Sequence, residues 1–118
     1  MTIRPIRQDM LALMAGKFRM LSDPTRLAIL HTLMSKGEMN VSQIVTATDQ
    51  QVANVSKHLK QLADAGLLTR RKEGSYVQYH LNDPVVEKIC ELVCDSLRRE
   101  IESQLKRSRR ILDQNQRR

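Results

Sequence analysis

The sequence predicts a mainly α-helical fold with one small β-hairpin, and three observations support this prediction. Apolar residues recur at helical spacing in four stretches between residues 8 and 65. Two short stretches around Glu73-Gly74-Ser75 are typical of paired strands. From Pro84 onward, apolar residues repeat in steps of four. A chain of 118 residues is long enough for one domain, which we expect over residues 1–118.

The first two helices are expected over residues 8–21 and from Pro24 to Gly37. Asp23 and Pro24 are typical of a helix start, because an aspartate oxygen can accept from the free N–H groups of the first turn. Proline is also tolerated at the first helical position. Gly37 is expected to end the second helix.

Residues 42–65 predict two helices joined by a short turn. The first is short, about residues 42–46, and the second begins after a cap at Thr48 or Asp49 and ends before Gly66. Its apolar side chains recur at steps of three and four, which predicts one buried face. The opposite face has hydrogen-bonding and basic side chains and no acidic one: Gln51, Asn54, Ser56, Lys57, Lys60 and Gln61.

The β-hairpin is expected over residues 67–81, with a glycine-containing turn. Its first strand carries the basic cluster Arg70, Arg71 and Lys72, and its second strand alternates in residue type.

The last helix is expected over residues 84–112, with residues 113–118 as a disordered tail. A helix of this length spans roughly 43 Å, whereas a domain of this size has a radius of gyration of only ~13 Å. Its apolar stripe is therefore too long to be buried on its own domain. A two-fold dimer built from this helix and the helix at 8–21 would bury it.

The composition points to a polyanionic partner. Lys and Arg number 20 against 13 Asp and Glu, a net charge of +7. The aromatic residues are Phe18, Tyr76 and Tyr79, too few for the base stacking on which single-strand binding depends. No apolar run approaches the ~18 residues of a membrane span. With two cysteines and no export signal in the first ten residues, a reducing cytoplasm is expected.

Helix, turn, helix and basic hairpin, in that order, form a winged helix-turn-helix. A helix fits the major groove of duplex DNA, where Asn, Gln, Ser and Lys can read base edges, while Arg and Lys of the hairpin can hold phosphates. The DNA contacts expected from this arrangement are Gln51, Asn54, Ser56, Lys57, His58, Lys60, Arg70, Arg71 and Lys72. His58 is included because it could reach a phosphate; His31 and His80 are expected to be ordinary packing or surface residues.

Four stretches of the sequence together resemble the ArsR/SmtB family of dimeric winged-helix repressors, from Met20 to about Leu97. They are LSDPTRLAIL at 21–30, VSKHLKQL at 55–62, AGLL at 65–68 and YHL at 79–81. The resemblance implies a homodimer that sits on an inverted-repeat operator, blocks transcription and releases DNA when an inducer binds. It also implies that Ser56 and Lys57, on the recognition helix, lie closest to DNA. It further implies that Ser75 and Tyr76 belong to the DNA-binding wing, together with the basic cluster of the hairpin.

Members of this family often sense metals, and the usual ligand sets are absent from this sequence. A Cys-x-Cys pair would fall within residues 40–45, which contain no cysteine. An Asp and His set on the last helix would begin at Asp83, but its histidine positions hold Val85 and Ser96. Asp83 is therefore interpreted as a helix cap, and no metal site or cofactor is predicted.

Cys90 and Cys94 lie four residues apart on one face of the last helix. Three interpretations stay open: two small buried hydrophobes in the dimer interface, a switch operated by thiol oxidation or reactive sulfur, or a soft-metal or arsenite site completed by the partner subunit. An intrahelical disulfide would be strained, because the two Cβ vectors run parallel.

The sequence has no recognisable catalytic motif or phosphate-binding loop, so an enzyme is not predicted. The alternative from another class is a basic interaction module that binds a protein or RNA and senses nothing.

Overall fold

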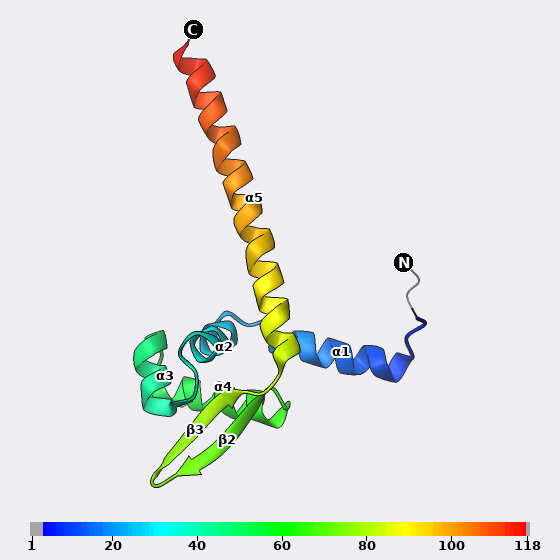
Figure 1. The fold of residues 1–118 in the computed structure, drawn as a ribbon, viewed down its shortest axis with the longest axis vertical. Coiled ribbons are helices and arrows are strands. Elements are labelled where there is room, and N and C mark those ends of the chain that lie inside the picture. The colour runs from blue at the N-terminus through cyan, green and yellow to red at the C-terminus, as the bar shows by residue number, and fades with distance from the viewer. Residues whose placement is uncertain (1–3, 118) are drawn as a thin grey trace. The chain divides into compact units, whose positions relative to one another are not determined.

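The computed structural model describes residues 4–117, and Figure 1 shows its helices and strands. In chain order these are α1 (Gln8–Met20), α2 (Pro24–Lys36), β1 (Met39–Asn40), α3 (Val41–Thr48), α4 (Val52–Asp64), β2 (Leu68–Glu73), β3 (Tyr76–Leu81) and α5 (Pro84–Gln116). The chain divides into two compact units, one ending at Asp83 and the other beginning at Pro84. The expected α+β fold, with a helix-turn-helix followed by a hairpin, is confirmed.

The core of the first unit lies among α2, α3, α4 and the sheet. Its fully buried side chains come from all three helices and from the segment after α4: Ile29, Leu30, Ile44, Val55, Leu59, Leu62 and Leu67. Burying a side chain of this size contributes about 1.5–3 kcal/mol. The apolar spacing in α4 therefore fixes which face of that helix points inward.

Most of the residues that the sequence predicts at helix ends lie at helix ends in the structure. An oxygen of Asp23 accepts from the backbone N–H of Arg26 at 3.0 Å, and Pro24 is the first residue of α2. This hydrogen bond, with the charge of Arg26, holds the pKa of Asp23 below its ordinary value. Gly37 and Gly66 follow α2 and α4 with φ of +83°, a conformation that side chains with a Cβ rarely adopt.

Two details of the helix-turn-helix differ from the prediction. Asp49 does not begin α4; it ends α3 in the left-handed conformation, with φ of +53°. The helix α3 also starts earlier than expected, because Asn40 and Gln43 form a capping box in which each side chain accepts from the other's backbone N–H at 2.9 Å.

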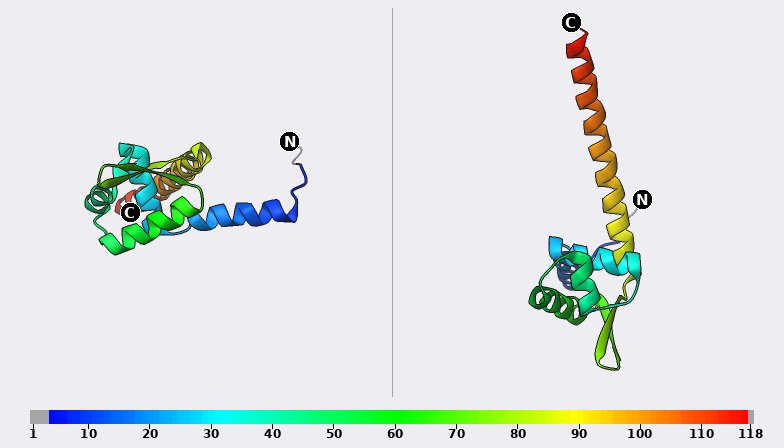
Figure 2. Two further views of the ribbon diagram at one scale, coloured as in Figure 1. Left: turned by 90° about the horizontal axis from the view of Figure 1, so that it is seen from below. Right: turned by 90° about the vertical axis from the view of Figure 1, so that its left-hand side faces the viewer.

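The hairpin belongs to a three-stranded antiparallel sheet with strand order β1-β3-β2. The two-residue strand β1 was not expected from sequence; it pairs with β3 through Met39 opposite Tyr79 and Asn40 opposite Gln78. Figure 2 shows that the tip of β2 and β3 projects beyond helices α2–α4.

The two helices at the chain ends expose most of their apolar side chains, although Val86 of α5 is buried. Helix α1 has no buried residue and exposes five large apolar side chains: Met10, Leu11, Leu13, Met14 and Phe18. Along α5 the exposed large apolar residues are Val85, Leu92, Val93, Leu97, Ile101, Leu105, Ile111 and Leu112. The expected tail is helical as far as residue 116, and Arg118 lies outside the described residues. In residues 4–117, no helix is long and apolar enough to cross a membrane.

The side chain of Arg26 joins three helices of the first unit. Its Nε donates to the carbonyl oxygen of Met20 at 2.9 Å, and its Nη2 to that of Arg19 at 3.0 Å. Its Nη1 lies 3.4 Å from Oε1 of Gln61 and 3.5 Å from Nδ1 of His58. Arg26 thus satisfies carbonyls at the end of α1 that have no partner within the helix, and it links them to α4.

We expect Arg26→Ala to lower the free energy of unfolding by about 1–3 kcal/mol, because the variant cannot form these hydrogen bonds from a charged donor. Urea unfolding at one fixed protomer concentration measures this change. Arg7→Ala is the matched control, since Arg7 makes an exposed ion pair with Asp9. Equal, small losses in both variants would contradict the role assigned to Arg26.

Candidate nucleic-acid interface

Helix α4 divides cleanly into a buried and an exposed face. Val55, His58, Leu59 and Leu62 are buried at helical spacing. The exposed face holds most of the predicted DNA-contacting residues of this helix: Gln51, Ser56, Lys57 and Lys60. Asn54 is half-buried, and its amide nitrogen lies 3.3 Å from Oε1 of Gln50. An open groove on the outer side of this helix is lined by Asp49, Gln50, Gln51, Ala53, Asn54 and Lys57.

The structure places His58, which was predicted to reach a phosphate, on the buried face of α4. Its side chain is only 7% exposed and lies beside Arg26 and the core residues of α4. The physical reason is its spacing, three residues after Val55 and four before Leu62, which places it on the buried face. The same spacing was visible in the sequence.

The basic residues of the hairpin have different surroundings. Arg70 and Lys72 alternate with Arg71 along β2 and therefore lie on the opposite face of the sheet. The guanidinium of Arg70 lies 5.8 Å from the centre of the Tyr79 ring, a cation–π geometry. Ser75 and Tyr76, at the tip, are exposed like the three basic residues.

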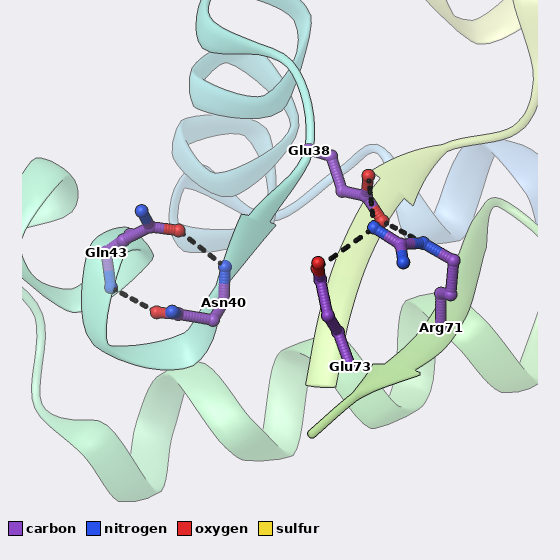
Figure 3. A network of polar contacts seen from close by, with 5 residues as sticks. All are labelled: Glu38, Asn40, Gln43, Arg71 and Glu73. Atoms are coloured by element: carbon purple, nitrogen blue, oxygen red, sulfur yellow. Dashed lines mark hydrogen bonds and ion pairs between the residues drawn. The ribbon is translucent and has the colours of Figure 1, made fainter. Parts of the chain in front are cut away.

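Arg71 is held by two carboxylates, as Figure 3 shows. Its Nε and Nη2 donate to the two oxygens of Glu38 at 3.0 and 3.1 Å, and Nη2 also donates to Glu73 at 3.1 Å. The bidentate pair lowers the pKa of the Glu38 carboxyl and raises the pKa of the Arg71 guanidinium.

These surfaces together offer the two kinds of group that duplex DNA recognition needs. The exposed face of α4 presents amides, a hydroxyl and ammonium groups, which can hydrogen-bond to base edges and phosphates. The projecting hairpin adds cations beside it. Sequence reasoning found these two elements but missed Glu38, whose position before a two-residue strand gives no recognisable sequence signal.

The two cysteines of α5 are both free thiols, and they differ in exposure. Cys94 is exposed, whereas Cys90 is half-buried, and burial with the nearby Cys94 raises the pKa of the Cys90 thiol. Within residues 4–117, no three His, Cys, Asp or Glu side chains come together as a metal site. Two thiolates are fewer than the four ligands of a typical structural zinc site.

Asp83 makes an ion pair that the sequence did not predict. Its Oδ2 accepts from the ammonium of Lys17 at 2.5 Å, which ties α1 to the residue before α5. Its capping of α5 stays a prediction.

Comparison with known proteins identifies relatives of this chain. A family model described as a helix-turn-helix domain matches residues 21–71. The arsenical resistance operon repressor of Escherichia coli K12 is 36% identical over 85 residues, which cover 72% of this chain and 73% of the relative. A cadmium resistance regulatory protein of Staphylococcus aureus, a CadC homolog, is 36% identical over 65% of this chain and 64% of its own length.

Solved structures that are similar to this chain also include DNA-binding regulators. The AntR antimony-specific transcriptional repressor superposes with a TM-score of 0.78 at 26% identity, covering 85% of this chain and 90% of its own. A homodimeric winged helix-turn-helix DNA-binding domain from Mycobacterium bovis, described as a possible ArsR-family regulator, has a TM-score of 0.72 at 29% identity. It covers 86% of this chain and 94% of its own.

We expect Lys57→Ala to weaken binding to duplex DNA and to reduce the salt dependence of that binding, because one fewer phosphate would be neutralised in each chain. The logarithmic slope should fall by about 0.9 per phosphate. Titrations at several salt concentrations measure both quantities. Lys88→Ala in α5 is the control, since it removes the same charge from an exposed position outside α4 and the hairpin. An unchanged affinity in Lys57→Ala would contradict the assignment of α4.

Proposed function

Because the chain belongs to the ArsR/SmtB family of winged helix-turn-helix transcriptional repressors, we propose that it represses transcription as a homodimer bound to an inverted-repeat operator. The observation that carries this proposal is the exposed polar face of α4, together with the projecting basic hairpin that follows α4 in the chain. The proposed activity is binding without catalysis. Genomic DNA lies in the cytoplasm of bacteria and archaea, so we expect the chain to act there.

The proposed dimer would cover the apolar side chains of the terminal helices. Phe18 is 53% exposed on α1, and Leu97 and Ile101 are 51% and 55% exposed on α5. Exposed apolar stripes of this length on two helices are typical of an oligomer interface. A two-fold axis would repeat α4 once in each half of the complex, which matches an inverted repeat with half-sites about one helical turn apart.

We assign base reading to Gln51, Asn54 and Ser56 and phosphate binding to Lys57 and Lys60. In the hairpin we assign phosphate or minor-groove contacts to Lys72, with Arg70, Ser75 and Tyr76 beside it. These roles rest on exposure and hydrogen-bonding capacity.

We propose that the inducer acts at the two thiols of α5. Cys94 would react first, because it is exposed and because the raised pKa of Cys90 keeps that sulfur protonated. Peroxide would transfer one oxygen to the Cys94 thiolate, which gives a sulfenic acid and releases hydroxide. A polar group added to the α5 stripe would change the dimer and with it the spacing of the two α4 helices.

The alternative inducer is a thiophilic metalloid or soft metal. The names of relatives from arsenical and cadmium resistance systems favour it. Arsenite would condense with both thiols, forming two As–S bonds and releasing two waters.

The DNA-binding proposal predicts a steep loss of affinity with salt and a clear preference for one sequence, by at least about a thousandfold over random duplex. Selection from a random duplex library followed by competition titration measures this preference, and sedimentation gives the stoichiometry. The selected sequence should be an inverted repeat that binds two chains. Equal affinity for all duplexes, or preference for RNA or a protein ligand, would support a basic interaction module instead.

The thiol proposal predicts that Cys90→Ser and Cys94→Ser bind operator DNA normally but resist release by inducer. Peroxide, polysulfide and arsenite, tested separately on the preformed complex, distinguish oxidative from metalloid induction. Loss of the peroxide response in Cys94→Ser alone would favour oxidation, whereas loss of the arsenite response in both variants would favour a site that needs two sulfurs. Ser103→Ala in α5 serves as control. Release identical to that of the unmodified protein under all three reagents would reject both thiol functions.

A further inference from the structure

We propose that Glu38 is a positioning residue for DNA binding, which holds the β2–β3 hairpin in place through Arg71. In this role Arg71 is part of a clamp and is not a phosphate ligand. The inference rests on the proposed DNA-binding function and replaces the sequence-based expectation for Arg71.

The geometry of the Glu38–Arg71 contact favours a clamp. The guanidinium of Arg71 uses Nε and Nη2 on the two oxygens of Glu38, and Nη2 also reaches Glu73 (Figure 3). Parallel hydrogen bonds of this kind fix the direction of both side chains as well as their distance. A phosphate could use this Nε/Nη2 edge of the guanidinium only by displacing a carboxylate.

The two residues lie on opposite edges of the sheet. Glu38 precedes β1 at one edge, and Arg71 lies on β2 at the other, with β3 between them. Asn40 and Arg71 both face Gln78, so they belong to one row across the three strands. The Glu38–Arg71 contact therefore joins the two outer strands independently of the backbone ladder.

The strand that follows Glu38 leads directly into the helix-turn-helix. Asn40 caps helix α3, the first helix of that motif, through its bonds with Gln43. Glu38, which belongs to the clamp, immediately precedes β1, and Asn40, the last residue of β1, caps α3. Through this strand, the clamp sets the hairpin at a fixed position relative to α3 and α4.

The charges around Arg71 also disfavour a phosphate at this position. Glu38 and Glu73 more than compensate its single positive charge, so this face of the hairpin offers no net attraction to a phosphate. The other face carries Arg70 and Lys72, because neighbouring residues of a strand point to opposite sides. Exposed ion pairs contribute little to stability. We therefore assign the contact a role in orientation.

The test uses two variants that change the charge in opposite directions. Glu38→Gln raises the net charge of each chain by one and Arg71→Gln lowers it by one, yet both should weaken operator binding by the same factor. We expect roughly tenfold, within the range of interaction energies for coupled neighbouring residues. The double variant should bind no more weakly than either single one. The exchanged pair Glu38→Arg with Arg71→Glu should recover most of the affinity. Glu102→Gln, an exposed site in α5, controls for net charge.

A measurement on the protein without DNA tests the Glu38–Arg71 clamp separately from the proposed DNA-binding function. Amide hydrogen exchange of Glu73–Tyr76 in the free protein should accelerate in both single variants and return toward the original rate in the exchanged pair. Tighter DNA binding by Glu38→Gln with weaker binding by Arg71→Gln would overturn the proposal, since Arg71 would then be a phosphate ligand that Glu38 restrains. Unchanged exchange together with unchanged affinity would also overturn it. Failure of the unmodified protein to prefer any duplex would instead refute the proposed function.

Discussion

Burial of one face of α4 sets the orientation of the whole recognition surface. Val55, Leu59 and Leu62 are fully buried among α2, α3 and the sheet. Once these three side chains are inside, the rotation of the helix is fixed, and its polar residues must face outward. Recognition chemistry on this helix is therefore a consequence of its packing. A polar residue that falls on the inner face, as His58 does, becomes a structural residue.

The charged residues are unevenly distributed between the helix-turn-helix, the hairpin and the chain ends. Residues 23–65 hold four basic and four acidic residues, so the helix-turn-helix core has no excess of either charge. The positive excess lies in the hairpin and toward both chain ends. In the hairpin, carboxylates compensate Arg71 on one face and leave Lys72 exposed on the other. Net charge attracts a polyanion at long range, whereas hydrogen-bonding side chains at short range select a sequence.

The two terminal helices leave a long apolar surface exposed. Helix α5 runs without interruption from Pro84 to Gln116, and its apolar stripe continues to Leu112. Helices in proteins gain most of their stability from the packing of such a face, and within one chain these side chains stay exposed. A second copy of the chain offers the same apolar residues by symmetry. The thiols of Cys90 and Cys94 lie on the same helix, where a change in polarity would act on the proposed dimer directly.

Local sequence patterns were sufficient to specify the helix order, the hairpin and the two faces of α4, because these follow from periodicity and from residues that favour helix ends and turns. The signals for the burial of His58 and for the Asn40 cap, three residues before Gln43, were also present, although the prediction missed both. The pairing of Arg71 with Glu38 and the linking of three helices by Arg26 emerged only from the folded chain. These contacts connect residues more than thirty positions apart or across separate elements, and no local pattern encodes which charged side chains will meet once the core has closed.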